Sequence, residues 1–285
     1  MKLGVSTYSL SRAIQSGEMT LAEAIRWIAD EGGEHVEIVP FGFNLTDNPG
    51  LIETIRREAE DAGLELSNYA VGANVPTDDE AGFEAEIARL MKEVDIANAL
   101  GVKRMRHDVA WREDTSVGLF LRELPKLAEA CRRVADYAAQ FGITTSVENH
   151  GYYIQASDRV LALIGAVDRP NFRLTLDVGN FMCADEESVA AVKKTISSAS
   201  MVHLKDFYLR PASRDPGEGW FPTLSGNRLR GAIVGQGDID MREALRVVKG
   251  SGYDGYLSVE FEGMEECRQG TRIGLANARR IWDEV

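Results

Sequence analysis

Short aliphatic stretches alternate with longer amphipathic stretches along the whole chain. The longer stretches, such as 21–32 and 85–101, carry apolar residues at helical spacing and end at a glycine. The short stretches have the length of single strands. This alternation is typical of repeated strand–helix units around a parallel sheet.

The pattern contains eight such units. The predicted strands cover residues 3–7, 35–39, 64–71, 102–107, 143–148, 172–177, 201–205 and 256–260. Successive strands end roughly every thirty residues, as a barrel with about 250 residues in eight units requires. We therefore predict an α/β protein, a single (β/α)8 TIM barrel domain spanning residues 1–285.

The spacing nearly doubles between the seventh and eighth predicted strands. The additional segment, at about 207–238, is rich in Pro, Gly, Arg and aromatic residues, among them Trp220 and Arg230. Long irregular loops in compact domains are usually functional or disordered. We predict a long loop between strand 7 and helix 7 that forms an ordered lid over the barrel mouth.

Side-chain direction in the last four strands locates the candidate chemistry. Residues two apart on a strand point the same way, and in these strands one face is aliphatic and is expected to pack on helices. The opposite face ends, at the C-terminal tip of each strand, in a residue that can bind metal: Glu148, Asp177, His203 and Glu260. Active sites of barrels lie at this end, so these four side chains are predicted to converge.

Three carboxylates in one small volume repel each other and raise each other's pKa unless a cation compensates them. We therefore predict one divalent metal ion. Three oxygen donors and one imidazole suit Mn²⁺, Mg²⁺, Co²⁺ or Zn²⁺, and we rank Mn²⁺ first. The alternative, four unrelated polar residues on loops, is disfavoured by their shared register.

Composition and charge restrict the partners. The 285 residues are 44% hydrophobic and 27% charged, as in an ordinary globular protein with a substantial core. A net charge of −13, with no local run of basic residues, disfavours nucleic acid and anionic lipid.

The three cysteines are far apart and show no CxxC spacing, so no disulfide framework or zinc knuckle is indicated. No long apolar run is present, and a cytoplasmic location is expected.

At these residues the chain resembles the xylose isomerase-like barrel superfamily, which includes sugar epimerases, inosose dehydratase, dehydroshikimate dehydratase and endonuclease IV. The resemblance lies in SVENHG at 146–151, LDVGN at 176–180, VHLKD at 202–206, VGQGDID at 234–240 and GYLSVEFEG at 255–263. It implies that the four side chains are metal ligands and that Glu148 and Glu260 form a proton-transfer pair beside a sugar-like substrate.

The chain departs from the pattern of two groups of family members, the epimerases and the DNA-repair enzymes. The epimerases often carry His where Asn180 stands. The DNA-repair members build a three-zinc site from many histidines, whereas this chain has only four in total. A trinuclear centre is therefore not expected.

We predict a metal-dependent isomerase or epimerase of a small keto-sugar. The metal would stabilise an enediolate while one glutamate removes a proton and the other returns it; which acts first stays open. The alternative is a dehydratase of a keto-cyclitol or dehydroshikimate-like substrate, in which the same base triggers loss of a β-hydroxyl. Apurinic endonuclease activity and a non-catalytic sugar-binding barrel rank lower.

Other residues near the expected barrel mouth are candidates for substrate binding: Tyr8, Glu37, His107, His150, Asn180 and Lys205. Each has a structural alternative, such as a surface salt bridge for Lys205 and a satisfied structural histidine for His107. Tyr152 is a similar candidate. Glu262 shares the inward parity but falls past the strand end, so Glu260 is preferred as the ligand.

The role of the Gly-rich loop and the oligomeric state both stay open. The Gly-rich VGQGD loop could bring backbone N–H groups to a substrate oxygen, or it could simply turn the chain before a helix. A homodimer or homotetramer is expected from barrels of this kind, although the sequence does not define an interface.

Overall fold

Eight parallel strands close into a barrel in the computed structural model, which describes residues 1–285. Around the barrel the strands follow the order β1-β11-β7-β6-β5-β4-β3-β2. Their bounds are β1 (Lys2–Ser6), β2 (His35–Ile38), β3 (Glu65–Val71), β4 (Arg104–His107), β5 (Thr144–Glu148), β6 (Phe172–Asp177), β7 (Ala199–Leu204) and β11 (Tyr256–Val259). The predicted fold class, a single (β/α)8 barrel, is confirmed.

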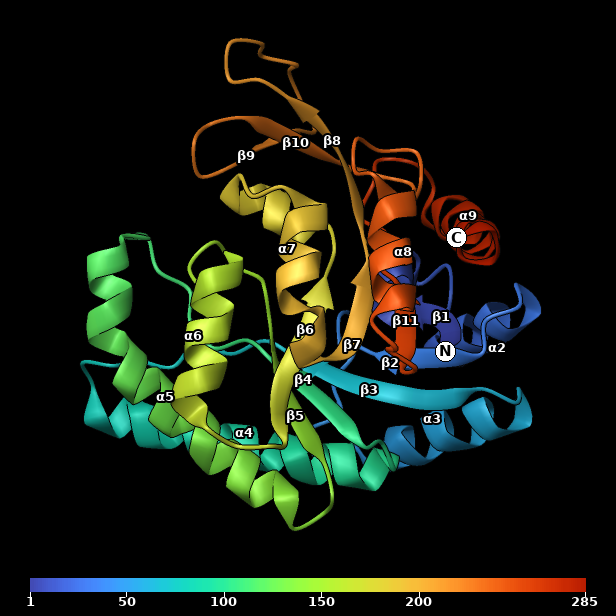
Figure 1. Cartoon of the computed structure of the whole chain (residues 1–285). Helices are drawn as coiled ribbons and strands as arrows, with labels where there is room; N and C mark the ends of the chain where they lie inside the picture. The colour runs from blue at the N-terminus through green and yellow to red at the C-terminus, as the bar shows by residue number, and fades with distance from the viewer.

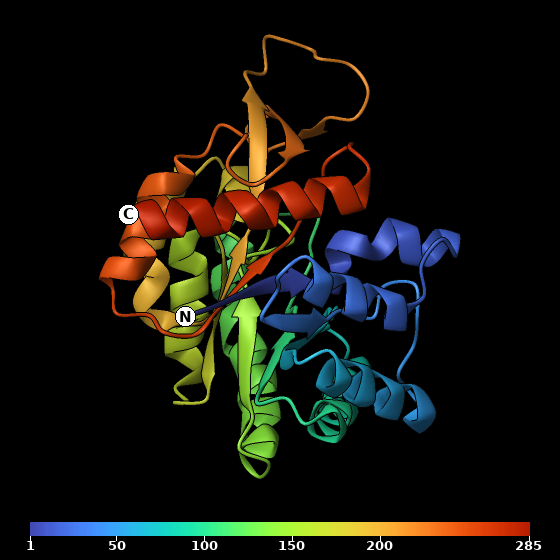
Figure 2. The same ribbon diagram turned by 90° about the vertical axis from the view of Figure 1, so that its right-hand side faces the viewer.

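Helices surround the barrel (Figures 1 and 2). They are α1 (Ser11–Ser16), α2 (Leu21–Asp30), α3 (Pro49–Asp61), α4 (Glu80–Leu100), α5 (Val117–Ala139), α6 (Ser157–Val167), α7 (Ser188–Thr195), α8 (Met241–Gly250) and α9 (Cys267–Glu284), with short 3-10 turns at Thr7–Leu10, Asn180–Ala184 and Ile196–Ser198. None of the helices is long and apolar enough to cross a membrane.

Local sequence explains where these helices begin and end. Thr20 and Glu23 form a reciprocal capping box at the start of α2. The predicted helix over 85–101 ends as α4 at Gly101, whose φ of 82° is readily adopted by glycine alone.

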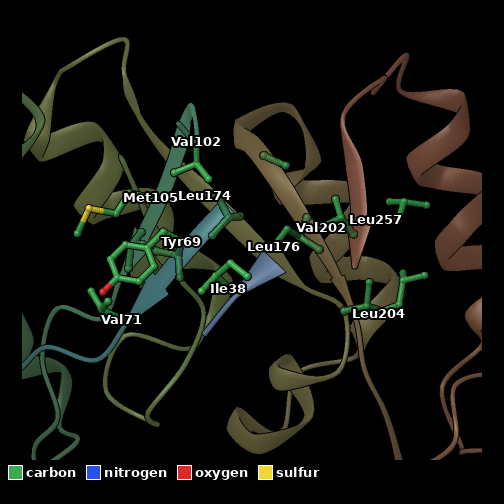
Figure 3. Close-up of a cluster of buried hydrophobic side chains, with 14 of the residues drawn as sticks. Ile38, Tyr69, Val71, Val102, Met105, Leu174, Leu176, Val202, Leu204 and Leu257 are labelled. Carbon is green, nitrogen blue, oxygen red and sulfur yellow. The ribbon is translucent and has the colours of Figure 1, made fainter. Parts of the chain in front are cut away.

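The main hydrophobic core lies between the strands and the helices. Figure 3 shows part of it, with Leu176 of β6 beside Val202 of β7. These two residues and their strand neighbours Leu174 and Leu204 are fully buried. These are the aliphatic positions of the alternating pattern, so the polar positions of the same strands point into the barrel.

The barrel interior below the strand tips is correspondingly polar and tightly filled. The Ser146 and Thr175 hydroxyls are hydrogen-bonded at 2.8 Å. His35 hydrogen-bonds through Nε2 to the Leu257 carbonyl at 2.9 Å, and its ring occupies the space that a side chain at Gly4 would need. This closed floor leaves the C-terminal end of the barrel as the open end.

The segment predicted as a long loop at about 207–238 contains a three-stranded antiparallel sheet. Its strands are β8 (Asp206–Arg210), β9 (Phe221–Pro222) and β10 (Arg228–Ala232), in the order β8-β10-β9. Phe207, Leu229 and Cys183 form a small buried cluster under it, with Phe221 packed against them. The prediction missed these strands because β9 has only two residues and the stretches between the strands are rich in Pro and Gly, which obscures a regular strand pattern. Figures 1 and 2 show the sheet projecting beyond the barrel.

The Gly-rich loop at 234–238 wraps around the Asp206 carboxylate. The backbone N–H groups of Gly235 and Gly237 donate to it at 2.9 and 3.0 Å, and Phe207 N–H donates at 2.9 Å. A Cβ at Gly237 would lie 2.1 Å from an Asp206 oxygen. The loop therefore turns the chain around a buried acid ahead of α8.

Candidate metal centre

Four side chains meet at the C-terminal tips of neighbouring strands. Glu148 ends β5, Asp177 ends β6, His203 lies in β7 and Glu260 directly follows β11. One potential ligand atom from each lies within 4.8 Å of those of the other three, and all four residues are buried. The shared register of parallel strands produces this convergence.

Asp177 shows that a cation fits this cluster. Its Oδ1 accepts the N–H groups of Gly179 and Asn180 at 2.7 and 2.8 Å, whereas its buried Oδ2 has no hydrogen-bond partner. Burial raises the pKa of Asp177 to about 6, and the charges of Glu148 and Glu260 act in the same direction. A divalent ion would coordinate this oxygen, which has no hydrogen bond, and relieve the repulsion.

His203 presents one nitrogen to the cluster and one to a supporting acid. Its Nδ1 lies 3.2 Å from Glu148 Oε1 and 3.7 Å from Glu260 Oε1. Its Nε2 donates to Glu37 Oε1 at 3.0 Å, and Glu37 also accepts the Asn68 amide at 2.7 Å. Burial lowers the pKa of His203, but the charges of Glu37, Glu260 and Glu148 outweigh this effect and hold the pKa well above its ordinary value.

Arg106 on β4 completes the charge arrangement on one side. Its Nη2 lies 2.5 Å from Glu148 and 2.9 Å from Asp108. Despite the opposing effect of burial, Arg106 and then His203 hold the pKa of Glu148 well below its ordinary value. The sequence prediction missed Arg106 and Asp108. The alternation that located Glu148 also applies to β4, since Arg106 pairs in register with inward-facing Ser146.

Lys205 supplies positive charge on the other side. Its Nζ lies 2.6 Å from Glu260, 3.2 Å from Glu262 and 3.5 Å from Asp177. Burial lowers the pKa of Lys205, but the charges of these three carboxylates outweigh this effect and hold the pKa well above its ordinary value. Lys205 is therefore a buried, ion-paired cation at the edge of the cluster.

A cavity of about 300 Å³ opens above the cluster. One wall is apolar and aromatic, with Tyr8 and Phe41 packed edge to face at 5.6 Å. The rest is charged, and its lining residues are Arg106, Asp108, Glu148, His150, His203, Lys205, Glu260 and Glu262. An apolar wall facing charged groups suits a small molecule with a hydrocarbon face and several hydroxyls.

The structure brings three of the predicted substrate contacts to this cavity: Tyr8, His150 and Lys205. His150 Nδ1 is 3.1 Å from Asp108. Glu37 lies behind His203. Asn180 lies behind the cluster, where its amide donates to Glu148 at 3.3 Å and its oxygen accepts from Lys205 at 3.4 Å.

The structure does not bring His107 or Tyr152 to the cavity. His107 has the opposite parity to Arg106 on β4, so its buried ring lies on the helix-facing side, 6.1 Å from the Phe172 ring. Its Nδ1 contacts the Asp108 carbonyl at 2.8 Å. Tyr152 instead donates its hydroxyl to the Pro222 carbonyl of β9 at 2.7 Å and so links the barrel to the small sheet.

Comparison with known proteins places this barrel in a family. A family model described as "Xylose isomerase-like TIM barrel" matches residues 25–281. The chain belongs to this family. An inosose dehydratase from Clostridium perfringens (strain 13 / Type A) is 25% identical over 230 residues, which are 75% of each chain.

One more sequence relative and one solved structure are similar to the chain. A 3-oxo-isoapionate decarboxylase from Pectobacterium atrosepticum is 26% identical over 251 residues, or 84% of this chain and 78% of that protein. A solved structure described as IOLI protein with a binding zinc atom has a TM-score of 0.78 at 16% identity and covers 100% of this chain and 99% of its own. The latter likeness concerns the fold alone.

Proposed function

We propose that this protein is a divalent-metal-dependent dehydratase that removes water from an uncharged keto-cyclitol. The buried four-residue cluster and the sequence similarity to an inosose dehydratase support this proposal. The sequence-based preference for an isomerase or epimerase gives way to its dehydratase alternative, because the two sequence relatives above carry the names of a dehydratase and a decarboxylase.

The ion pairs in the cavity favour an uncharged substrate over an anionic one. Arg106 is paired with Glu148 and Asp108, and Lys205 is paired with Glu260 and Glu262. Both of these cations therefore already face two carboxylates, and the two histidines of the cavity also have acidic partners, Asp108 for His150 and Glu37 and Glu148 for His203. Since no basic side chain in the cavity lacks an acidic partner, an uncharged polyol ketone fits better than a dehydroshikimate-like acid.

The metal ligands in this proposal are Glu148, Asp177, His203 and Glu260, with Mn²⁺ ranked first among the divalent ions that suit three carboxylates and one imidazole. A bound divalent ion would act as a Lewis acid that polarises the substrate carbonyl and makes the neighbouring C–H more acidic. Glu37 would keep the His203 ring oriented through its hydrogen bond to Nε2.

The side chains around the cavity perform the proton transfers. Glu148 or Glu260 takes the proton from the carbon next to the carbonyl, and the electron pair of that bond moves toward the carbonyl. The β C–O bond then breaks, and the departing hydroxyl receives a proton from Lys205 or His150, two of the N–H donors that line the cavity. The sum is one keto-cyclitol converted to one unsaturated ketone and one water.

Product analysis tests the proposal. The manganese-loaded protein would be incubated in D₂O with a 2-keto-inositol, a ketohexose and a cyclohexene carboxylic acid that carries a ketone and a β-hydroxyl, and each mixture would be followed by ultraviolet absorbance and mass spectrometry. We expect the keto-cyclitol alone to lose one water and gain the absorbance of a conjugated enone or enol.

Other outcomes have definite meanings. A ketohexose that gains deuterium without losing mass would replace the dehydratase proposal with an epimerase. Turnover of the carboxylic acid alone would overturn the assignment of an uncharged substrate. The Glu129→Gln variant, which changes an exposed residue on α5, serves as a matched control and should behave like the unchanged protein.

A further inference from the structure

Three basic side chains gather at the N-terminal end of the barrel, opposite the metal cluster. Lys103 and Arg104 lie at the start of β4 and Arg173 lies near the start of β6. They line a cavity of about 310 Å³ together with Gly142, Thr144, Pro170 and Ser200. Because Arg104 and Arg173 are 69 positions apart in the chain, the sequence shows no basic run that joins them.

No carboxylate lines this cavity, and none of the three cations forms an ion pair. Their neighbours are backbone carbonyls instead. Arg104 Nε donates to Ser200 O at 2.9 Å, Arg173 Nη2 donates to Ser197 O at 2.8 Å, and Lys103 Nζ donates to Phe141 O at 3.2 Å.

These contacts orient the side chains without neutralising them. The Arg104 guanidinium also stacks over the Tyr256 ring, 4.8 Å from its centroid. The acid beyond that ring, Glu65, is already occupied by an ion pair with Lys2 and by the Tyr256 hydroxyl at 2.6 Å. The remaining N–H groups of both guanidinium groups are therefore available to a ligand.

A chain with 45 acidic and 32 basic residues has enough carboxylates to pair its cations. Three unpaired cations held around one hollow repel each other unless an anion lies between them. Guanidinium groups match the oxygen geometry of phosphate and carboxylate in a bidentate manner, and phosphate carries the greater charge.

We propose that this hollow is a binding site for a phosphate-type oxyanion, either inorganic phosphate or a small phosphate monoester. The volume exceeds that of one phosphate group, so a small organic portion can be accommodated. The site is independent of the proposed reaction, because it lies at the other end of the barrel from the catalytic cavity.

Calorimetric titration with inorganic phosphate tests the site. The metal-loaded protein would be titrated at constant ionic strength, with chloride replacing phosphate in the reference. We expect saturable binding of one phosphate per chain with a Kd of about 1 mM or tighter. Arg173→Gln should weaken it by about tenfold or more, and Arg104→Gln combined with Arg173→Gln should abolish it.

Two controls keep the result interpretable. Arg214→Gln removes an exposed arginine in the small-sheet segment and should leave phosphate binding unchanged. Glycerol phosphate, titrated in parallel, separates a monoester site from one that accepts only the free ion. Phosphate binding that is absent in the unchanged protein, or equal in Arg173→Gln and the unchanged protein, would overturn the proposal.

Discussion

Glu37 and His203 form a hydrogen bond of 3.0 Å across the interior of the barrel. Their strands, β2 and β7, are not neighbours in the sheet, so the contact spans the space enclosed by the strands. Both residues are almost fully inaccessible to solvent. An acid held on one imidazole nitrogen fixes the direction in which the other nitrogen can bind a metal.

The first prediction concerns this contact. Glu37→Gln keeps the shape of the side chain but removes the charge that fixes the His203 ring, so we expect divalent metal affinity to fall about 10- to 100-fold. Competition with a chelating dye measures the change, and Glu129→Gln serves as the surface control. Equal affinity in the Glu37→Gln and unchanged proteins would contradict the supporting role of Glu37.

The second prediction concerns proton transfer. Glu148→Gln and Glu260→Gln each lose a carboxylate that can act as base, and we expect kcat on the keto-cyclitol to fall about 100-fold or more. The rate would be measured at saturating metal, with metal content determined for each variant. Full turnover in either metal-loaded variant would show that this glutamate takes no part in proton transfer.

The third prediction concerns pH and the barrel floor. Burial lowers the pKa of His35 to about 4, so the folded state holds this ring neutral while the unfolded chain protonates it near 6.5. As pH falls below the unfolded value the unfolded state binds more protons, and stability decreases until pH reaches the folded value. Between about pH 7 and about pH 5 the loss from this group is about 2 kcal/mol.

Urea denaturation of the unchanged protein and of His35→Gln at both pH values tests whether His35 lowers the stability on acidification. The carboxylates titrate in both proteins, so the difference between the two pH dependences isolates His35. We expect the variant to lose about 2 kcal/mol less on acidification. Identical pH dependences would contradict a neutral buried His35.

The fourth prediction concerns the small sheet. Asp185 accepts hydrogen bonds from Thr223 Oγ1 and Ser225 N–H, both at 2.7 Å, and from the Asn227 amide at 3.0 Å. Asp185→Ala removes all three and should loosen the sheet, so trypsin should cleave after Arg214 several times faster.

Asp254→Ala is the matched control, because Asp254 is an exposed acid in the loop before β11 and lies outside both the small sheet and the Arg214 cleavage site. Cleavage kinetics followed by mass spectrometry measure the effect. Equal cleavage rates in the Asp185→Ala and unchanged proteins would show that these bonds do not hold the sheet.

The alternating pattern of the strands was sufficient to predict the barrel and the convergence of the metal-binding side chains. Strand parity decides which side chains point inward, and it does so for Glu148 and Asp177 from the sequence alone. The same rule applied to β4 gives Arg106 on the inside and His107 on the outside. His107 ends this strand and has suitable chemistry, but its parity directs the ring toward the helices, in agreement with the structural alternative.

Contacts between distant segments were not predictable in this way. The pairing of Lys205 with Glu262 depends on how the chain turns after β11, and strand periodicity carries no information past the strand end. The sheet at 206–232 was missed for a related reason, since β9 has only two residues. The basic hollow depends on the spatial proximity of β4, β6 and β7, which lie far apart in the chain.

The most direct test of the metal centre is the divalent metal content per chain. The protein and its Asp177→Asn variant would be loaded with Mn²⁺, passed through a desalting column and analysed by elemental mass spectrometry. We predict one ion per chain in the unchanged protein and almost none in the variant, since a neutral amide cannot supply the charge that the buried oxygen of Asp177 provides. Equal metal content in the two proteins, or none in either, would contradict the account.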